Sequence, residues 1–417
     1  MNKYLIKGGG KLNGKICIPS AKNSVLPILA SAVLIDGKIT LHNCPNLRDV
    51  DSMIKILKNI GCIIEKQDDT LIIDSSRVAN GEIDKDLAKE LRSSIFLLGP
   101  ILARLKKAKV AYPGGCEIGL RPIDLHLSGL RALNIDIQES GGYIYCDSKN
   151  AKSSDITLGL PSVGATENIM MASIFTKGRT IIRNVAREPE IVDLQNFLNK
   201  AGAKIYGAGS SVIVVEGVEK LHSVEYTPIP DRIVAGSYMI SVVMCGGDVE
   251  FCNVIAEHIH SLLSKFSKTT CNISMKNDII RLQSNGRHRG LGKIDTVYYP
   301  GFPTDLQSQM LALASICDGN SIITENIFET RFKQVPEFIK MGANIQVSGR
   351  TAIVQGVKSL DGAEVTAYDL RGGASLVSMG LFANGETLVN DIYHIERGYE
   401  SIDKDYNSLG ANIIKLP

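Results

Sequence analysis

The chain has 417 residues, of which 44% are hydrophobic, enough for two or three domains with sizeable cores. Its 46 basic and 44 acidic residues leave a formal net charge of +2, which argues against a general nucleic-acid-binding protein because such proteins usually carry a marked basic excess. The nine cysteines include no CxxC pair, the first ten residues lack an apolar core of signal-peptide length, and no apolar run approaches the ~18 residues that span a bilayer. We therefore expect a soluble cytoplasmic protein with reduced thiols and no membrane partner.

A small turn-and-strand motif recurs along the chain. It stands at residues 37–40, 108–111, 178–181, 247–250, 319–322 and 385–388, at steps of 71, 70, 69, 72 and 66 residues. An apolar segment of helical length precedes each motif, at residues 23–34, 91–105, 165–176, 232–245, 305–317 and 374–383. A second helix follows, as at residues 50–60, 190–200 and 335–340, and ends at a small-residue turn. The pattern predicts an α/β fold of six units of about 70 residues, three in each of two lobes.

One cysteine, Cys116, lies in a loop with three glycines, and Arg121-Pro122 then opens a predicted helix. The start of a helix offers unpaired N–H groups to an anion. A thiol in such a setting can have its pKa drawn below the free value of about 8.5. Free cysteines are more often buried gap-fillers, but the glycine-rich surroundings favour a reactive thiol here.

Basic residues recur near the starts of the predicted helices, where the helix dipole disfavours a cation by ~0.3–1 kcal/mol. Each arginine alone could be part of a surface ion pair of little energetic value. As a set they predict a site for a ligand with more than one anionic group, since arginine binds phosphate and carboxylate bidentately. The set comprises Lys22, Arg92, Arg121, Arg232, Arg331, Arg371 and Arg397.

Among the acidic residues, Asp305 follows Phe302-Pro303-Thr304 at the start of a predicted helix. It could cap that helix, or it could accept a proton from a substrate hydroxyl beside the cationic site, and the residues leave both open. Asp231 and Asp369 are more simply ion-pair partners of nearby arginines. The histidines show no metal-ligand spacing apart from His258 and His260, so we assign no metal and no cofactor.

Several longer motifs carry a resemblance. They are residues 20–23 (Ser-Ala-Lys-Asn), 91–94 (Leu-Arg-Ser-Ser), 113–126 around Cys116, 161–168 (Pro-Ser-Val-Gly-Ala-Thr-Glu-Asn), 186–190, 230–232, 302–305, 328–332, 369–371 and 393–400. Together they resemble the UDP-N-acetylglucosamine 1-carboxyvinyltransferases, a family of enolpyruvyl transferases, over essentially the whole chain. The resemblance implies two inside-out α/β lobes, with helices inside and sheets outside. We expect residues 21–229 to form the lobe with the Cys116 loop and residues 1–20 plus 230–417 the other, with the active site in the cleft between them.

The resemblance also implies a reaction, the transfer of the enolpyruvyl group of phosphoenolpyruvate to the 3-hydroxyl of UDP-N-acetylglucosamine at the start of peptidoglycan synthesis. Cys116 would be the general acid and the site of a pyruvate or fosfomycin adduct, and Asp305 the base. The positions implied for phosphoenolpyruvate are Lys22, Asn23, Arg121, Arg331, Arg371 and Arg397, of which Lys22 and Arg397 are also expected to act in catalysis. Those implied for the nucleotide sugar are Arg92, Arg121, Pro122, Ile123, Asp124, Leu125, Ser162, Val163, Gly164, Asp305 and Ile327.

One departure and three alternatives remain. Leu160 stands where some family members have a lysine, which puts one nucleotide-side contact in doubt. A 5-enolpyruvylshikimate-3-phosphate synthase shares the fold and phosphoenolpyruvate, but it has no cysteine lid. A catalytically silent paralogue that binds nucleotide sugars is disfavoured because Cys116, Asp305 and the cationic positions are all present. A protein that processes nucleic-acid ends is disfavoured by the net charge of +2. The sequence leaves the oligomeric state open.

Overall fold

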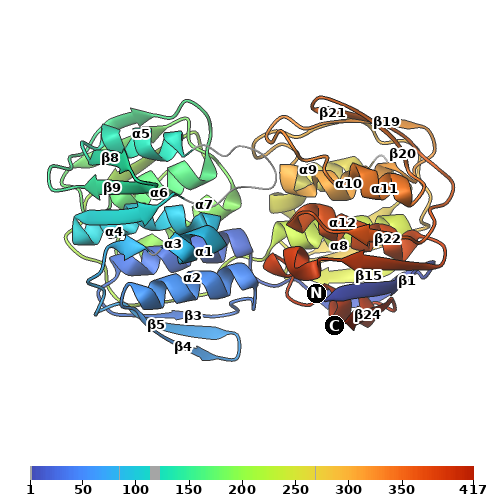
Figure 1. Ribbon diagram of the computed structural model, residues 1–417, viewed down its shortest axis with the longest axis horizontal. Helices are drawn as coiled ribbons and strands as arrows, with labels where there is room; N and C mark the ends of the chain where they lie inside the picture. Colours follow the sequence, from blue (N-terminus) through green and yellow to red (C-terminus); the bar gives the residue numbers. More distant parts are fainter. Residues whose placement is uncertain (1, 84, 113–122, 268) are drawn as a thin grey trace. The chain divides into compact units, whose positions relative to one another are not determined.

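The computed structural model describes residues 2–417 except 84, 113–122 and 268, together with every side chain of those residues but that of Arg92. The described chain divides into two compact units (Figure 1). The N-terminal unit consists of residues 20–229 and the C-terminal unit of residues 2–19 and 230–417, leaving residues 113–122 aside. Both units mix helices and strands, so the predicted α/β class is confirmed.

Three four-stranded sheets form the surface of the N-terminal unit. Their strand orders are β14-β3-β5-β4, β6-β7-β9-β8 and β10-β11-β13-β12. In each sheet the second strand runs parallel to the first and antiparallel to the third. The strands are β3 (Lys38–Leu41), β4 (Ile63–Gln67), β5 (Thr70–Asp74), β6 (Glu82–Ile83), β7 (Lys107–Ala111), β8 (Asp136–Ser140), β9 (Tyr143–Asp147), β10 (Asp155–Thr157), β11 (Arg179–Arg183), β12 (Lys204–Tyr206), β13 (Val212–Glu216) and β14 (Val224–Tyr226).

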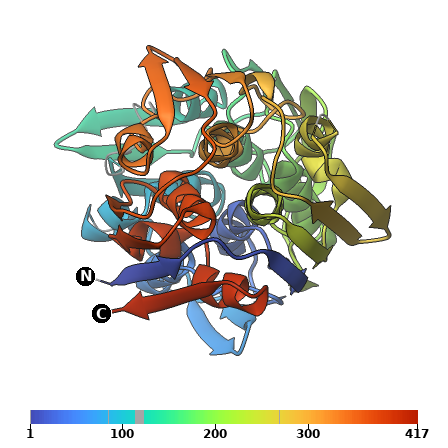
Figure 2. The ribbon, with the colours of Figure 1, turned by 90° about the vertical axis from the view of Figure 1, so that its right-hand side faces the viewer.

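The C-terminal unit repeats this arrangement, with the N-terminal strands completing two of its sheets. The strand orders are β16-β17-β15-β2, β18-β19-β21-β20 and β22-β23-β1-β24. Figure 2 shows β1 beside β24, as their antiparallel pairing requires. The strands are β1 (Lys3–Lys7), β2 (Leu12–Cys17), β15 (Gly247–Cys252), β16 (Asn272–Lys276), β17 (Ile279–Ser284), β18 (Gly292–Asp295), β19 (Asn320–Thr324), β20 (Asn344–Ser348), β21 (Thr351–Gln355), β22 (Glu364–Thr366), β23 (Glu386–Asn390) and β24 (Asn412–Leu416).

The interior of each unit contains almost wholly buried helices, such as α1 and α6 in the N-terminal unit and α8, α10 and α12 in the C-terminal unit. More exposed helices pack beside these. In the N-terminal unit the helices are α1 (Lys22–Ser31), η1 (Ala32–Leu34), α2 (Arg48–Asn59), α3 (Lys85–Glu90), η2 (Arg92–Leu97), α4 (Leu98–Leu105), α5 (Asp124–Ala132), α6 (Val163–Ala172) and α7 (Pro189–Lys200). In the C-terminal unit the helices are α8 (Arg232–Cys245), η3 (Ala256–Ile259), α9 (His260–Phe266), η4 (Thr304–Leu306), α10 (Gln307–Ala314), α11 (Val335–Lys340), α12 (Leu370–Phe382), η5 (Ile392–Arg397) and α13 (Ile402–Ser408).

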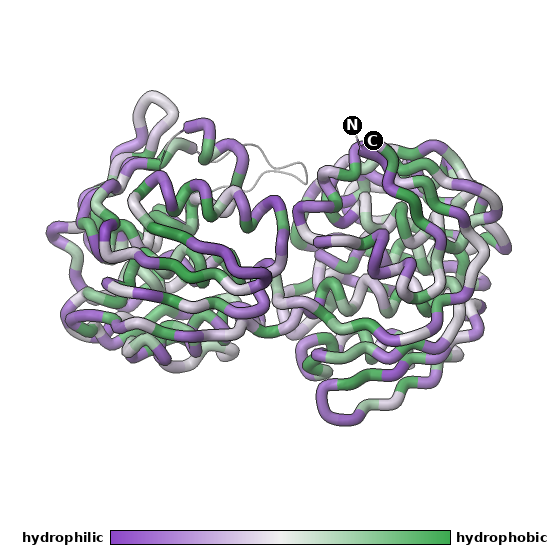
Figure 3. Tube along the Cα trace, turned by 90° about the horizontal axis from the view of Figure 1, so that it is seen from below, coloured by the Kyte–Doolittle hydropathy of each residue, from purple (hydrophilic) through white to green (hydrophobic). Residues whose placement is uncertain are grey.

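The central helices are buried on all sides, as expected for helices that other elements enclose. Every residue of α10 is buried, and so are all residues of α8 except Cys245. The strands instead alternate between buried and exposed residues, so each sheet turns one face to these helices and the other to solvent. Figure 3 shows hydrophobic and hydrophilic residues alternating along the trace of each unit.

Close backbone approach fixes the start of β15. A Cβ atom on Gly247 would come within 1.8 Å of the carbonyl oxygen of Leu12, and the residue has a φ of +135°. Only glycine accepts both constraints, so β2 can lie directly against β15. The N-terminal segment is thereby held in the C-terminal unit.

Candidate active site

The carboxylate of Asp305 lies against two arginines of the C-terminal unit. Arg331 Nη2 donates a hydrogen bond of 2.5 Å to Asp305 Oδ1, and Arg371 Nη2 lies 3.7 Å from Asp305 Oδ2. The side chain of Asp305 is 27% exposed, whereas those of Arg331 and Arg371 are 3% and 4% exposed. Pro303, not Asp305, takes the N-cap position of η4, and no side chain caps that helix. Asp305 is thus an accessible ion-pair partner of two buried guanidinium groups.

Three further contacts hold the Arg331 side chain. Its Nε donates to Thr304 Oγ1 over 3.2 Å, its Nη1 lies 3.9 Å from Asp369 Oδ1, and its guanidinium carbon is 5.2 Å from the centre of the Phe328 ring. A buried guanidinium is costly unless carboxylates and other acceptors surround it. These contacts therefore fix the direction in which Arg331 faces Asp305.

Arg371 is the second residue of α12. Asp369 caps this helix by accepting from the backbone N–H of Arg371 at 2.9 Å, and Arg371 Nη1 donates to the hydroxyl of Tyr399 over 3.3 Å. Burial acts to lower the pKa of Arg371, but the charges of Asp305, Tyr399 and Asp231 outweigh it and raise this pKa above its usual value. Asp231 caps α8 in the same way, accepting from two backbone N–H groups. Asp231 and Asp369 are thus both helix caps and charge partners.

Glu325 joins the Asp305 segment to the loop that carries Ile327. One carboxylate oxygen accepts from Thr304 Oγ1 at 2.9 Å, and the other accepts from the backbone N–H groups of Ile327 and Phe328 at 2.8 and 3.0 Å. Glu325 is only 1% exposed. Glu325 was not predicted as a site residue, although its place directly after a strand and before the 328–332 motif was a usable signal.

Arg397 is the last residue of η5 and is half-buried. We expected it near the start of a second helix, but the next helix, α13, begins only at Ile402. The difference arises because residues 392–397 form their own helical turn, which packs against α12. Tyr399, two residues further on, reaches Arg371 from this side.

In the N-terminal unit, Lys22 forms an ion pair with Asp49. Lys22 Nζ lies 2.8 Å from Asp49 Oδ2, and the side chains are 10% and 7% exposed. Lys22 is the first residue of α1, with Asn23 half-buried beside it, and Asp49 belongs to the first turn of α2. Asp49 was not predicted as a site residue, since nothing local to residues 48–59 indicates a partner 27 positions away.

The segments expected to bind the nucleotide sugar include the starts of η2, α5 and α6. Ser162 caps α6 by accepting from the backbone N–H of Ala165 at 3.4 Å. A Cβ atom on Gly164 would come within 2.7 Å of the Phe96 ring in η2 and 3.0 Å of the His126 ring in α5, so the start of α6 packs closely on both of these helices. A side chain larger than glycine would push them apart.

Asn168, in α6, links this helix to α4, η2 and α5. Its Oδ1 accepts from the N–H of Gly99 at 2.6 Å, while its Nδ2 donates to the carbonyl of Ile95 at 2.7 Å and lies 2.9 Å from His126 Nδ1. The side chain is fully buried. Asn168 therefore sets the positions of Ser162, Val163 and Gly164 relative to η2 and α5.

The remaining residues of the prediction are placed as follows. Ile123 is buried at the N-cap position of α5, Asp124 is exposed in its first turn, and Leu125 packs on the core of the N-terminal unit. Leu160 is 57% exposed. Arg92 begins η2, and its side chain is outside the described part of the chain. Cys116, Arg121 and Pro122 also lie outside the described residues.

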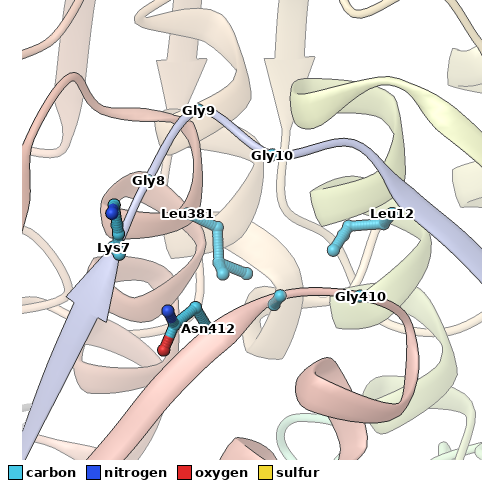
Figure 4. Close-up of a pocket in the computed structure, with 9 residues that line it drawn as sticks. Lys7, Gly8, Gly9, Gly10, Leu12, Leu381, Gly410 and Asn412 are labelled. Atoms are coloured by element: carbon cyan, nitrogen blue, oxygen red, sulfur yellow. The ribbon is translucent and has the colours of Figure 1, made fainter.

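A cavity of about 260 Å³ lies elsewhere in the C-terminal unit (Figure 4). Its walls come from the glycine turn between β1 and β2, from Leu381 and from residues 410–412. None of the predicted site residues lines it. Across residues 2–83, 85–112, 123–267 and 269–417, no group of three or more His, Cys, Asp or Glu side chains is arranged to hold a metal ion. Within the same residues, every helix is too short or too polar to cross a bilayer.

Comparisons with known proteins agree with this architecture. Residues 6–405 match the family model of EPSP synthase (3-phosphoshikimate 1-carboxyvinyltransferase). The fold is similar to that of the enolpyruvyl transferase NikO from Streptomyces tendae, with a TM-score of 0.89 at 21% identity, covering 100% of this chain and 99% of that one. It is also similar to EPSP synthase from Acinetobacter baumannii, with a TM-score of 0.77 at 16% identity over 100% of both chains.

Two curated relatives are much more similar in sequence. UDP-N-acetylglucosamine 1-carboxyvinyltransferase 2 of Caldanaerobacter subterraneus subsp. tengcongensis is 50% identical over 416 residues, covering 100% of both chains. UDP-N-acetylglucosamine 1-carboxyvinyltransferase 1 of Symbiobacterium thermophilum is 47% identical over 420 residues, covering 99% of this chain and 95% of the relative. The chain therefore belongs to the enolpyruvyl transferase family, in which its relatives of this similarity are UDP-N-acetylglucosamine 1-carboxyvinyltransferases.

Proposed function

We propose that this enzyme transfers the enolpyruvyl group of phosphoenolpyruvate to the 3-hydroxyl of UDP-N-acetylglucosamine and releases phosphate, the first committed step of peptidoglycan synthesis. The observation that carries the proposal is the full-length identity of 50% to a relative of that name. The Asp305 cluster supports it, because a partly exposed carboxylate on two buried guanidinium groups suits the chemistry.

The substrates explain the cations. Phosphoenolpyruvate has a phosphate and a carboxylate, and the nucleotide sugar has two phosphates, so fixed positive groups must replace the water around them. We assign phosphoenolpyruvate to Lys22, Asn23, Arg121, Arg331, Arg371 and Arg397. We assign the nucleotide sugar to Arg92, Arg121 to Leu125, Ser162 to Gly164, Asp305 and Ile327. Each unit thus supplies residues for both substrates.

The reaction proceeds by addition and elimination. A proton from Cys116 goes to the methylene carbon of phosphoenolpyruvate, the sugar oxygen bonds to its C2, and Asp305 accepts the hydroxyl proton. In the elimination, the Cys116 thiolate takes a proton back from the new methyl group while the C2–O bond to phosphate breaks. The departing phosphate carries away the proton that Asp305 accepted. The products are the enolpyruvyl ether and hydrogen phosphate, and both residues return to their starting protonation states.

In this scheme, the ion pairs of Asp305 connect the binding of phosphoenolpyruvate to the acceptance of the hydroxyl proton. Before substrate arrives, Asp305 is paired with Arg331 and Arg371, the two arginines that we assign to phosphoenolpyruvate. An anion bound to them takes over part of that pairing. The carboxylate released from it becomes a stronger proton acceptor at the moment when the hydroxyl needs one.

The first test is the release of phosphate from phosphoenolpyruvate with either of two acceptors. We expect release with UDP-N-acetylglucosamine and none with shikimate 3-phosphate. Release with shikimate 3-phosphate alone would overturn the substrate assignment and favour the activity named by the family model. No release with either acceptor, despite binding of the nucleotide sugar, would identify a catalytically silent paralogue.

Variants of Cys116 test the proposed acid. We expect Cys116→Ser to lose turnover and labelling by fosfomycin, because a hydroxyl is a far weaker acid than a thiol. Cys116→Asp restores an acidic proton without a thiol, so it should retain turnover and resist fosfomycin. A fully active Cys116→Ser enzyme would rule out the acid role of Cys116.

A further inference from the structure

Two cysteines that the proposed reaction does not use are direct neighbours in the C-terminal unit. Strand β2 runs parallel to β15, and Cys17 is the register partner of Cys252 at the end of both strands. Neighbouring strands lie about 4.8 Å apart, and the Cα atoms of a disulfide are usually about 4.4–6.8 Å apart. The backbone spacing of this pair therefore suits a disulfide.

The side chains of the pair also share a face. Ile16 and Phe251, one position earlier in each strand, are buried register partners that point to the core. Successive side chains of a strand alternate between its faces, so Cys17 and Cys252 both point outward. Cys17 is exposed, while Cys252 is 7% exposed beneath it.

Contacts between the two thiols support this placement. Burial raises the pKa of Cys252, and a hydrogen bond with the thiol of Cys17 raises it further. Cys252 Sγ also donates to the carbonyl of Ile16 over 3.3 Å, which holds the sulfur over β2. An accessible thiol therefore stands in contact with a sheltered one.

We propose that Cys17 and Cys252 form a reversible disulfide when the protein meets a peroxide oxidant. Hydrogen peroxide transfers one oxygen to the Cys17 sulfur, giving a sulfenic acid and water. The Cys252 sulfur then attacks the Cys17 sulfur, the S–S bond forms, the S–O bond breaks, and hydroxide leaves with the Cys252 proton as a second water. Two electrons pass from the sulfurs to the peroxide, and a dithiol reductant returns them.

The disulfide would hold the end of β2 against β15, at the point where the N-terminal segment leaves the sheet. The N–H of Ile18 donates to the carbonyl of Cys252 at 3.0 Å, and Asn253 Nδ2 donates to the carbonyl of Ile18 at 2.7 Å. The N–H of Asp231 donates to the carbonyl of Pro19 at 2.8 Å. A covalent link at Cys17 would stop β2 from separating from β15 at this end, and it would close a chain loop of more than 230 residues.

Peptide mapping of the full chain tests the proposal. After treatment with hydrogen peroxide, blocking of free thiols and trypsin digestion without reductant, we expect peptide 16–22 linked to peptide 233–265. Dithiothreitol should separate the two peptides, and the oxidised protein should unfold about 5 °C higher than the reduced protein. Peptide 16–22 with a sulfinic or sulfonic acid at Cys17 and no link, or linked to any other peptide, would overturn the proposal.

Two serine variants identify the partner sulfur. Peptide 233–265 contains both Cys245 and Cys252. We expect Cys245→Ser to leave the link intact and Cys252→Ser to abolish it, with the Cys17 sulfenic acid then trapped by dimedone. A link that persists in Cys252→Ser and disappears in Cys245→Ser would contradict the assignment.

Discussion

Two carboxyl groups, Asp305 in the C-terminal unit and Glu167 in the N-terminal unit, have opposite electrostatic surroundings. In the C-terminal unit Asp305 and Asp369 lie against Arg331 and Arg371, so the buried charges neutralise one another. In the N-terminal unit Glu167, in α6, is fully buried, and within the described residues neither of its carboxyl oxygens has a hydrogen-bond partner. Burial raises the pKa of Glu167 well above its usual value, and the charges of Glu190 and Glu188 raise it further.

The contrast distinguishes a carboxylate that stays charged, Asp305, from a carboxyl group that is neutral in the folded protein, Glu167. A paired carboxylate stays ionised and can respond when another anion competes for its arginines, whereas a carboxyl group in an apolar core becomes neutral by holding its proton. The C-terminal cluster is therefore suited to proton transfer and anion binding. Glu167 instead contributes a neutral polar group at the centre of its unit.

The largest expected effect comes from Asp305→Ala, which removes the proposed proton acceptor. We expect kcat to fall about 10³-fold, as for the loss of a general base, while the Kd for UDP-N-acetylglucosamine changes by less than about tenfold. Phosphate release and calorimetric titration measure the two quantities. The matched variant Asp305→Asn should show the same loss of kcat, and turnover within tenfold of wild type in either variant would contradict the role of base.

Glu167→Gln should stabilise the protein in a pH-dependent way. The folded pKa of Glu167 lies above the unfolded value of about 4.3, so in wild type the unfolded state ionises first and the stability contribution is lost as pH rises above about 4.3. Glutamine removes this slope. We expect the free energy of unfolding of the variant, relative to that of wild type, to rise as the pH increases from 5 to 8, measured by denaturant unfolding.

Exposed Glu65 of β4 provides the control for this prediction. Glu65→Gln should leave the difference between pH 5 and pH 8 close to that of wild type. If the stability of Glu167→Gln relative to wild type instead falls as the pH is raised from 5 to 8, Glu167 is ionised in the folded protein. The contrast between Asp305 and Glu167 would then be wrong.

Asp49→Asn should weaken the binding of phosphoenolpyruvate, because it removes the charge that orients Lys22. We expect kcat/KM for phosphoenolpyruvate to fall about tenfold, largely through KM, with little change in KM for the nucleotide sugar. Steady-state kinetics with each substrate varied in turn measures this. Asp51→Asn, an exposed change in the same turn of α2, should be near wild type, and equal losses in both variants would point to damage to the helix.

The smallest expected effect is at the surface pair of Asp248 with Arg281, which are 2.6 Å apart on the outer face of β15 and β17. Hydrogen bonds from Arg281 and Gln283 lower the pKa of Asp248 to about 2. The stabilisation of the folded protein by ionised Asp248 is therefore fully present above the unfolded pKa of about 3.9, and it is lost as the pH falls through about 2. We expect Asp248→Asn to cost less than about 1 kcal/mol at pH 7, and less still in high salt.

Asp155 forms the corresponding pair with Arg183 in the N-terminal unit, at 2.8 Å. Thermal unfolding of Asp155→Asn and Asp248→Asn at pH 7 and pH 3 should show the same direction of change. A large loss of thermal stability in only one of the two variants would show that these surface ion pairs differ in strength between the units.

Much of the fold could be predicted because its signals are local. The apolar run at residues 232–245 coincides with α8, and Asp231 and Gly246 mark its ends. The helix expected at residues 374–383 begins earlier, at Leu370, because Gly372 and Gly373 hide the helical pattern while Asp369 caps it. The segment at residues 91–105 divides into η2 and α4, with no long regular helix.

The candidate site was predictable only where motifs carried it. Asp305, Arg331 and Arg371 are brought together in space from three motifs. Asp49 and Glu325 were missed, and Tyr399 was given no role although it lies in the 393–400 motif. The importance of each depends on a partner that is distant in sequence and adjacent only after folding. The distinction between paired Asp305 and neutral Glu167 also depends on burial, which no local pattern of charges reveals.

The placement of β1 and β2 has a consequence for biosynthesis on the ribosome. All strands of the three N-terminal sheets lie between residues 38 and 226, so that unit can fold while later residues are still being made. The register partner of Leu12 is Gly247, and at about 5–20 residues per second the ribosome needs about 10–50 s to reach it. Until then β1 and β2 have unsatisfied edges of the kind that promote aggregation, and the lysines at positions 3, 7 and 15 supply the charge that discourages it. The first residues to leave the ribosome are thus among the last to be placed.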